Sequence, residues 1–235
     1  MEPAVTSTAP ELAKRQLDIG TMIHDWEAGQ SFWADTVGLS YTKFEKIGGG
    51  VRQHRFDGNG SVIKVNHSRQ PMDPHPTIHR RLRIVSDRVT EPRLVHDPEG
   101  VEVELVPAGH DDIIDVEIVN ATANLGEARR FWVNGIGGTE IGPGRFRVGD
   151  SIVGCVEELD LTRPTNRRAP GFRYLTVQVQ HVDEAWPRLV EMGFVGETPP
   201  VSLGETARVS FVRDPDGGYL EVSERAEFTG RPIPR

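Results

Sequence analysis

The chain has few cysteines and no long apolar segment. Cys155 is the only cysteine in the 235-residue sequence, which excludes an intramolecular disulfide and is typical of a reducing, cytoplasmic environment. No apolar run is long enough to cross a bilayer, and the first residues lack the basic-then-apolar pattern of a secretory signal. We therefore expect a cytoplasmic protein without a membrane partner.

Positive residues are also outnumbered by negative ones. The sequence has 27 Lys and Arg against 35 Asp and Glu, and its formal net charge is -8. Nonspecific binding to nucleic acid or to an anionic membrane needs a positive surface, so both classes of partner are disfavoured. The sequence also has no phosphate-binding loop, serine triad or nucleotide-binding motif. We expect a monomer or a homodimer.

The chain does contain a repeated phrase. The residues Asp-Pro-Glu-Gly-Val-Glu-Val-Glu at 97–104 return as Asp-Pro-Asp-Gly-Gly-Tyr-Leu-Glu at 214–221. Both copies lie in a strand-turn-strand pattern, and each ends on a glutamate. Because a repeat reflects a repeated structural unit, Glu104 and Glu221 are predicted to occupy equivalent sites.

The repeat belongs to a longer unit of one strand, one helix and three strands. In the first copy a strand at 16–24 precedes Asp25, a predicted N-cap, and Gly38 ends the helix. The run Asp-Gly-Asn-Gly at 57–60 predicts a hairpin, since these residues accept positive φ. The three strands that follow the helix are expected at 39–45, 51–56 and 61–66.

The same order starts again near residue 113 and near residue 173. In the copy at 113, Asn124 and Glu127 resemble a capping box, and Phe-Trp at 131–132 repeats Phe-Trp at 32–33. In the last copy we expect a helix at about 183–192 and strands at 207–213 and 218–223.

The second copy, at 77–108, is reduced. Only residues 86–92 separate its strands at 82–85 and 93–96. A helical crossover needs about a dozen residues, so this copy is predicted to lack its helix.

This pattern resembles the vicinal oxygen chelate superfamily, the group of glyoxalases, bleomycin-resistance proteins and extradiol dioxygenases. The resemblance rests on Phe-Trp in the helix, Val-Gly-Leu at its end and the Asp-Pro-Glu-Gly turn before a strand with Glu, and it covers residues 16–225. It implies an α+β fold of four βαβββ-type modules in two pseudo-symmetric halves with glyoxalase-like curved sheets. Each half is expected to wrap around its own cup, with module two degenerate.

The predicted organisation has four parts. Residues 16–110 form the N-terminal half with the truncated second module, and residues 111–226 form the C-terminal half. The residues at 1–15 and 227–235 are expected to be flexible tails.

In this superfamily a divalent metal often sits in the cup, held by the first strand of a module, usually through His, and by the last strand, usually through Glu. The resemblance places Glu221 and Glu104 at last-strand positions. It places four residues at or near first-strand positions: Asp18, His79, Glu117 and Tyr174.

The resemblance thus implies a C-terminal site in which Glu221 and Tyr174 are catalytic and Glu117 and Glu221 are metal ligands. An alternative N-terminal site would combine Asp18, His79 and Glu104. The metal would be Mg, Mn or Zn, and a metal-free site remains open, because the C-terminal set holds no imidazole. Two histidines and a carboxylate are not available at the aligned positions, which disfavours an Fe(II) extradiol dioxygenase.

The leading functional hypothesis is a lyase or isomerase that polarises a carbonyl or enolate oxygen of a small organic molecule. The alternative is a metal-free small-molecule binding protein of the resistance type. Two basic clusters are predicted either to guide an anionic ligand to the cup or to lie in solvated loops. They are Arg80, Arg81 and Arg83 in one segment and Arg163, Arg167 and Arg168 in another.

Overall fold

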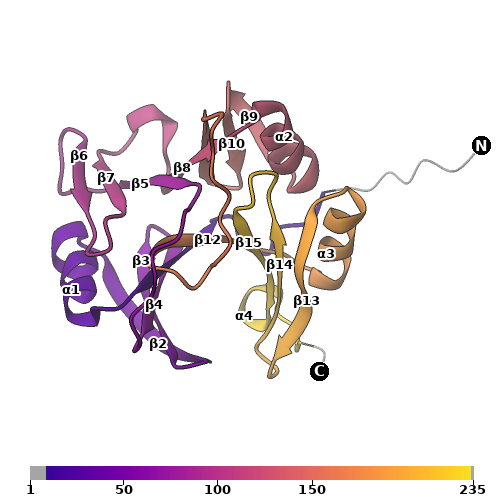
Figure 1. Ribbon diagram of the computed structural model, residues 1–235, viewed down its shortest axis with the longest axis horizontal. Coiled ribbons are helices and arrows are strands. Elements are labelled where there is room, and N and C mark those ends of the chain that lie inside the picture. The colour runs from indigo at the N-terminus through magenta and orange to yellow at the C-terminus, as the bar shows by residue number, and fades with distance from the viewer. Residues whose placement is uncertain (1–8, 234–235) are drawn as a thin grey trace, which may run out of the picture.

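The computed structural model describes residues 9–233 and folds them into two curved sheets (Figure 1). The larger sheet has eight strands in the order β13-β14-β15-β12-β1-β4-β3-β2. Its strands are β1 (Asp18–Ile23), β2 (Ser40–Gly48), β3 (Val51–Gly58), β4 (Ser61–Ser68), β12 (Gly171–Gln178), β13 (Val195–Leu203), β14 (Ala207–Arg213) and β15 (Tyr219–Arg225).

The smaller sheet has seven strands in the order β6-β7-β5-β8-β11-β10-β9. Its strands are β5 (His79–Val85), β6 (Arg93–His96), β7 (Glu102–Val106), β8 (Val116–Thr122), β9 (Thr139–Gly142), β10 (Arg145–Val148) and β11 (Ser151–Glu157). The α+β fold of four modules with curved sheets is confirmed.

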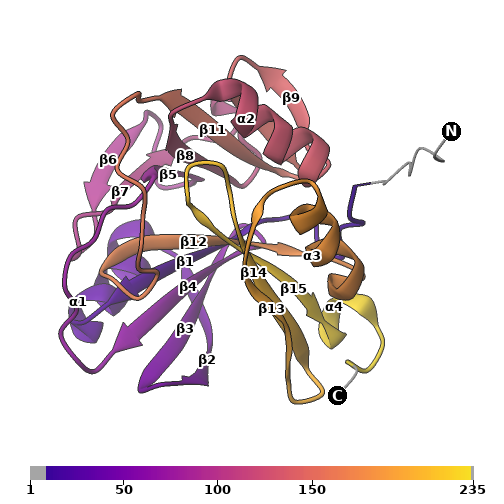
Figure 2. The ribbon, with the colours of Figure 1, turned by 45° about the vertical axis from the view of Figure 1, so that its right-hand side comes forward.

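The sheets join modules that are not neighbours in the chain. β1 of the first module pairs with β12 of the fourth, and β5 of the second pairs with β8 of the third. Figure 2 shows the first and last modules side by side, with indigo β1 next to orange β12. The expectation that the two modules of each half share a sheet around one cup is therefore wrong, because modules one and four share one sheet and modules two and three share the other.

Two of the helices begin at the predicted caps. Asp25 Oδ1 accepts the Ala28 N–H, and Asn124 Oδ1 accepts those of Gly126 and Glu127. The Glu127 side chain contacts Arg130, so only one half of a capping box forms. The helices are α1 (Trp26–Ser31), continued by a π-helical turn at Phe32–Val37, α2 (Leu125–Arg129), continued by one at Arg130–Gly135, α3 (Val182–Glu191) and α4 (Ala226–Thr229).

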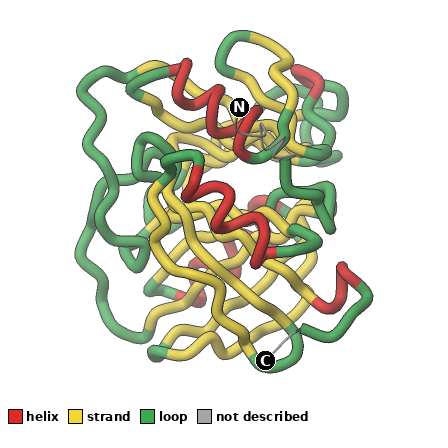
Figure 3. Tube along the Cα trace, turned by 90° about the vertical axis from the view of Figure 1, so that its right-hand side faces the viewer, coloured by secondary structure: helices red, strands yellow, loops and turns green. Residues whose placement is uncertain are grey.

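The Phe-Trp pairs anchor these helices to the sheets. The two rings of each pair meet edge to face, with centroids 5.1 Å apart in the first module and 5.0 Å apart in the third. All four rings belong to one apolar core that includes strands of both sheets. Figure 3 shows helices lying across the outer face of the strands, which leaves the inner face of the larger sheet for other side chains.

The second module has no helix between β5 and β6, as predicted. Strand β13 was not among the predicted strands, and it contains Pro199 and Pro200. These prolines are tolerated because β13 lies at the edge of the sheet, where a missing N–H leaves no neighbour unpaired, and the register shifts between Thr198 and Val201.

The ends of the described chain are held by contacts. Leu12 bridges Val179, and the Gln180 N–H donates to the Glu11 carbonyl at 2.9 Å. Ile233 is buried beyond α4. The predicted tails at 1–15 and 227–235 are thus ordered at 9–15 and 227–233, and the remainder of both lies outside the described residues. Within residues 9–233, no helix is long and apolar enough to cross a membrane.

Candidate functional site

Strand alternation gathers polar side chains on the inner face of the larger sheet. β1 and β12 run antiparallel, with Asp18 opposite Thr176 and Gly20 opposite Tyr174. Cross-strand partners point to the same face of a sheet, so these residues share one side. The intervening Ile19 and Leu175 point the other way, into the core.

The flanking parallel strands add one charged residue each to this face. Lys64 of β4 lies beside Gly20, and Glu221 of β15 lies beside Thr176. The pairing is symmetric about the contact between Ile19 and Leu175, so the two-fold that relates the modules exchanges Lys64 with Glu221. The last-strand position that carries a carboxylate in the fourth module therefore carries an ammonium in the first.

Lys64 is 1% exposed and lies among oxygen atoms. Its Nζ donates to Thr176 Oγ1 at 2.7 Å and to Glu221 Oε1 at 3.2 Å, and Asp18 Oδ2 is 3.9 Å away. Burial lowers the pKa of Lys64, although Glu221 and Asp18 oppose that shift. Burial alone would raise the pKa of Asp18, but Lys64 and Lys14 outweigh it and hold that pKa below its ordinary value.

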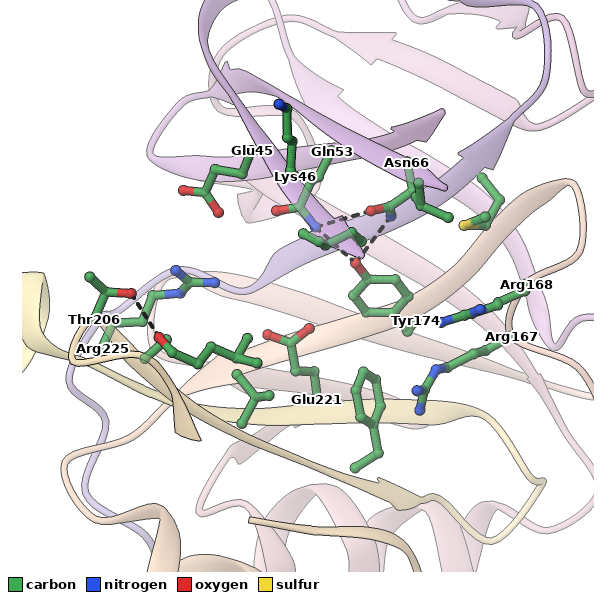
Figure 4. A pocket seen from close by; sticks show the side chains of 17 residues that line it. Glu45, Lys46, Gln53, Asn66, Arg167, Arg168, Tyr174, Thr206, Glu221 and Arg225 are labelled. Carbon is green, nitrogen blue, oxygen red and sulfur yellow. Dashed lines mark hydrogen bonds between the residues drawn. The ribbon is translucent and has the colours of Figure 1, made fainter. Parts of the chain in front are cut away.

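A cavity of about 660 Å³ opens above this face (Figure 4). Tyr174 and Glu221 both line it, so the two residues predicted as catalytic lie in one site. Its apolar lining is Met22, Ile47, Val51, Leu203, Ala207, Val209 and Phe211. Its polar and charged lining is Glu45, Lys46, Gln53, Asn66, Arg167, Arg168, Tyr174, Thr206, Glu221 and Arg225.

The Tyr174 hydroxyl is oriented by two amides. It accepts a hydrogen bond from Asn66 Nδ2 at 3.1 Å and one from Gln53 Nε2 at 3.5 Å. Its ring lies on Gly20, where a Cβ would come within 2.2 Å of the ring, so the position needs glycine. Burial and the charge of Glu221 raise the pKa of Tyr174. The hydroxyl keeps its proton, and that proton is available to a ligand oxygen.

The Glu221 carboxylate is held at one oxygen and open at the other. Oε1 accepts from Lys64, whereas no hydrogen bond from another described residue reaches Oε2. The residue is 7% exposed and lines the cavity below the Tyr174 ring, and its cross-strand neighbour Phe211 meets that ring edge to face. This arrangement can accept a proton or a hydrogen bond from a bound molecule.

Comparison with known proteins identifies the family of the chain. The model of the Glyoxalase/Bleomycin resistance protein/Dioxygenase superfamily matches residues 19–222. The chain belongs to this superfamily. No curated protein matches it.

Solved structures of superfamily type share the fold at low identity. Glyoxalase I from Zea mays is 10% identical with a TM-score of 0.69, covering 92% of this chain and 95% of that chain. A putative dioxygenase from Bacillus subtilis subsp. subtilis str. 168 is 13% identical with a TM-score of 0.69, covering 92% and 86%. These likenesses show the glyoxalase-type fold alone.

The metal that the superfamily resemblance implies does not fit the cup of modules one and four. Lys64 already holds Glu221 Oε1 and lies near Asp18, so a divalent cation would meet a buried positive charge. Tyr174 is protonated and is a poor ligand. Among residues 9–233 no three His, Cys, Asp or Glu side chains are arranged to hold a metal ion.

The structure places Glu117 and Glu104 in the smaller sheet, away from Glu221. Arg83 joins the two carboxylates, at 2.5 Å from Glu117 and 2.7 Å from Glu104, and Arg145 Nε is 2.7 Å from the other Glu117 oxygen. Both Glu117 oxygens are thus held by guanidinium groups. The predicted pair of Glu117 and Glu221 is not brought together.

The alternative trio of Asp18, His79 and Glu104 is not assembled either. Asp18 lies in the larger sheet with Lys64, whereas Glu104 lies in the smaller sheet with Arg83. His79 bonds Asn120 Oδ1 at 2.7 Å and stacks on Phe172. Burial lowers the pKa of His79 to about 4, so the ring is neutral at pH 7.

The two basic clusters differ in their surroundings. Arg80 pairs with Glu158, and Arg81 pairs with Glu102, so with Arg83 the first cluster is neutralised. In the second cluster Arg167 and Arg168 line the cavity.

Sequence reasoning missed the residues that support Tyr174 and Glu221. Lys64 and Asn66 alternate with the core residues Ile63 and Val65 in β4, which is the pattern of a strand with one polar, buried face. That alternation was readable, but the contact with Glu221 was not, because β4 and β15 are far apart in sequence. The other missed residues are Glu45, Lys46, Gln53, Thr206 and Arg225.

Proposed function

We propose that the protein is a metal-independent lyase or isomerase. It removes a proton from the carbon atom adjacent to a carbonyl group of a small organic molecule. The observation that supports it most is the open Oε2 of Glu221, which shares the cavity with the Tyr174 hydroxyl while Lys64 holds Oε1. A base and a hydrogen-bond donor facing one cavity are the two groups that enolisation requires.

In this mechanism Glu221 removes the proton from the carbon adjacent to the carbonyl. The electron pair of that C–H bond moves to the carbonyl oxygen, where the Tyr174 hydroxyl donates a hydrogen bond to the developing enolate. Returning the proton to a neighbouring carbon gives an isomer, and loss of a group from the β carbon gives an unsaturated product. Lys64 is a positioning residue, because it is buried beneath the cavity and holds the base.

The chain of amides behind Tyr174 supports this assignment. Arg55 contacts Glu45 at 2.7 Å and Gln53 at 2.9 Å, and Gln53 donates to Asn66 Oδ1 at 3.0 Å. A hydroxyl fixed in this way needs little reorganisation when the enolate forms.

A second candidate is a binding protein that sequesters its ligand without turnover. The apolar wall of the cavity favours it, since Met22, Val51, Val209 and Phe211 offer a surface for an apolar body. The two candidates differ in whether Glu221 exchanges a proton with the ligand.

The test is hydrogen-deuterium exchange at carbon, followed by NMR in D₂O over a panel of small carbonyl compounds. Wild-type protein should exchange at least one of them, Glu221→Gln should lose about 10²-fold or more of the rate, and Tyr174→Phe should lose a smaller factor. Glu224→Gln is the matched control, since Glu224 is equally buried on β15 but binds the Val182 N–H and Arg231.

Exchange that survives in Glu221→Gln would contradict the assignment of the base. Tight binding of a panel compound without exchange would favour the binding protein. Elemental analysis of dialysed wild-type and Glu221→Gln protein tests metal independence: stoichiometric metal that disappears in the variant would overturn it.

A further inference from the structure

We propose that the ligand of this cup carries an oxyanion, a carboxylate or a phosphate monoester, on an apolar body, and that Arg168 and Arg167 bind that group. The inference rests on the proposed function, because it names the substrate class of the same site. The superfamily match does not imply this class.

The cavity has a surplus of positive charge in an acidic protein. Four cations line it, and among the described residues none of the four forms an ion pair with a carboxylate: Lys46, Arg167, Arg168 and Arg225. The two carboxylates of the lining are already matched, Glu45 by Arg55 and Lys43, and Glu221 by Lys64. An anionic group that enters the cavity would therefore meet cations that no carboxylate of the described residues already pairs with.

The surplus is concentrated at one end. Arg225 lies on the side of Glu45, whose pKa it helps to lower, so part of its charge is compensated. Arg167 and Arg168 lie together at the opposite end of the cavity, beyond Tyr174 (Figure 4). No carboxylate lines the cavity at this end.

Arg167 is fixed in place by an aromatic ring. Its guanidinium lies 3.9 Å from the centroid of Phe211, which also lines the cavity. A stacked guanidinium keeps its edge free for a planar, two-oxygen acceptor, and little side-chain entropy remains to be lost on binding.

Arg168 lies between the cup and a second cavity of about 330 Å³. The two cavities share Met22 and Val51 as well as Arg168, so a ligand in the cup can extend into the second one. The rest of the second cavity is lined by Gly49, Gly50, Ser68, Arg69, Gln70 and Met72, so that it adds one further cation, Arg69, to an otherwise uncharged wall.

The turn at 48–50 makes room for this guanidinium. All three glycines there have positive φ, and a Cβ at Gly49 would lie 3.1 Å from Arg168 Nη1. A side chain at Gly49 would therefore press on the guanidinium and narrow the end of the cup where the oxyanion is placed.

The proposal is tested by isothermal titration calorimetry with four probes: phenylacetate, phenyl phosphate, phenylacetamide and inorganic phosphate. The first two share a benzene ring with the neutral amide, and inorganic phosphate has the charge without the apolar body. We expect one or both ring-bearing anions to bind at least about tenfold more tightly than the amide and than inorganic phosphate, with an affinity that falls as salt is added. Whichever of these two anions binds more tightly identifies the oxyanion of the ligand as a carboxylate or a phosphate.

Arg168→Gln and Arg167→Gln should each lower the affinity for the more tightly bound anion by about tenfold and leave the affinity for the amide unchanged. Arg163→Gln is the matched control, because Arg163 is an exposed arginine of the same connector that does not line the cup. Thermal unfolding of each variant checks that the fold is intact. Equal affinity for anion and amide, equal losses in Arg163→Gln and Arg168→Gln, or no binding of either ring-bearing anion would overturn the proposal.

The Glu221→Gln variant separates the two proposals. It should bind the better anion at least as well as wild type, because it removes a negative charge from the cup. Binding that persists while no carbonyl compound exchanges its proton would leave the anion site standing and reject the proton transfer alone.

Discussion

At the scale of single residues, the cup depends on Lys64. An ammonium without access to water is stabilised only by the oxygen atoms around it, and here Thr176, Glu221 and Asp18 provide them. The same lysine fixes which Glu221 oxygen is left open to the cavity. Stability and site geometry are therefore coupled through one side chain.

Replacing Lys64 with Met should destabilise the fold by about 3–5 kcal/mol at neutral pH, because Glu221 loses its buried counter-charge and Asp18 keeps only its ion pair with Lys14. Lys64 holds the pKa of Asp18 below its ordinary value. Without Lys64 the pKa of Asp18 rises, so the folded variant binds a proton more readily than the folded wild type does. The stability that the variant lacks relative to wild type should therefore shrink as the pH falls towards about 4. Urea unfolding at several pH values measures both effects.

Lys46→Met is the control, since Lys46 is exposed and should change stability by less than about 0.5 kcal/mol. The double variant Lys64→Met with Glu221→Gln should recover part of the loss. A deficit that is independent of pH and is not rescued in this way would show that packing of the lysine stem, and not charge, is what matters.

At the scale of elements, the hydrogen bonds of the two Asp-Pro turns explain why the phrase occurs twice. Asp97 Oδ1 accepts the N–H groups of Glu99 and Val101, and Asp214 Oδ1 accepts those of Asp216 and Gly218. Each aspartate thus closes the turn that leads into the last strand of its module. The phrase encodes this local geometry, which is why it predicted architecture better than chemistry.

Burial raises the pKa of Asp214 to about 7. The folded state therefore binds this proton more strongly than the unfolded chain, and the stability it contributes at low pH is lost as the pH rises towards 7. Asp214→Asn keeps the acceptor oxygen and has no charge to bury. We expect its stability to fall less than that of wild type between about pH 4 and pH 8.

The measurement is urea unfolding across that range, with exposed Asp160→Asn as control. If Asp214→Asn and wild type change in parallel with pH, Asp214 is ionised in the folded protein and the assignment is wrong.

At the scale of the whole molecule, the candidate cup exists only because the two ends of the chain meet. β1 pairs with β12 along its length, and the base on β15 is held by the lysine on β4. The N-terminal and C-terminal halves each contribute one module to each sheet. Neither half contains a complete sheet.

Expressed separately, residues 1–110 and 111–235 should not give cooperative unfolding, because each would expose the open edges of β1 and β5 or of β12 and β8. Co-refolding of the two fragments should restore a cooperative transition. Circular dichroism melts combined with size-exclusion chromatography measure this. Two monomeric fragments that each unfold cooperatively would contradict the account and would support independent halves.

The modules could be predicted from the sequence, since caps, turns and strand alternation act between residues that are close along the chain. Asp25, Asn124, Gly38 and the hairpin at 57–60 lie where local chemistry predicts them. The sequence also placed Tyr174 and Glu221 in one cup, because both belong to the fourth module, where β12 and β15 are neighbours.

Which modules share a sheet depends on long-range packing, and the character of the site follows from that pairing. The modules are similar units, so local signals do not distinguish a first-with-second pairing from a first-with-fourth pairing. The observed pairing places Lys64 in contact with Glu221 and Arg83 in contact with Glu117. A contact between residues so distant in the chain depends on which sheet edges meet, and that is settled by the packing of the whole core.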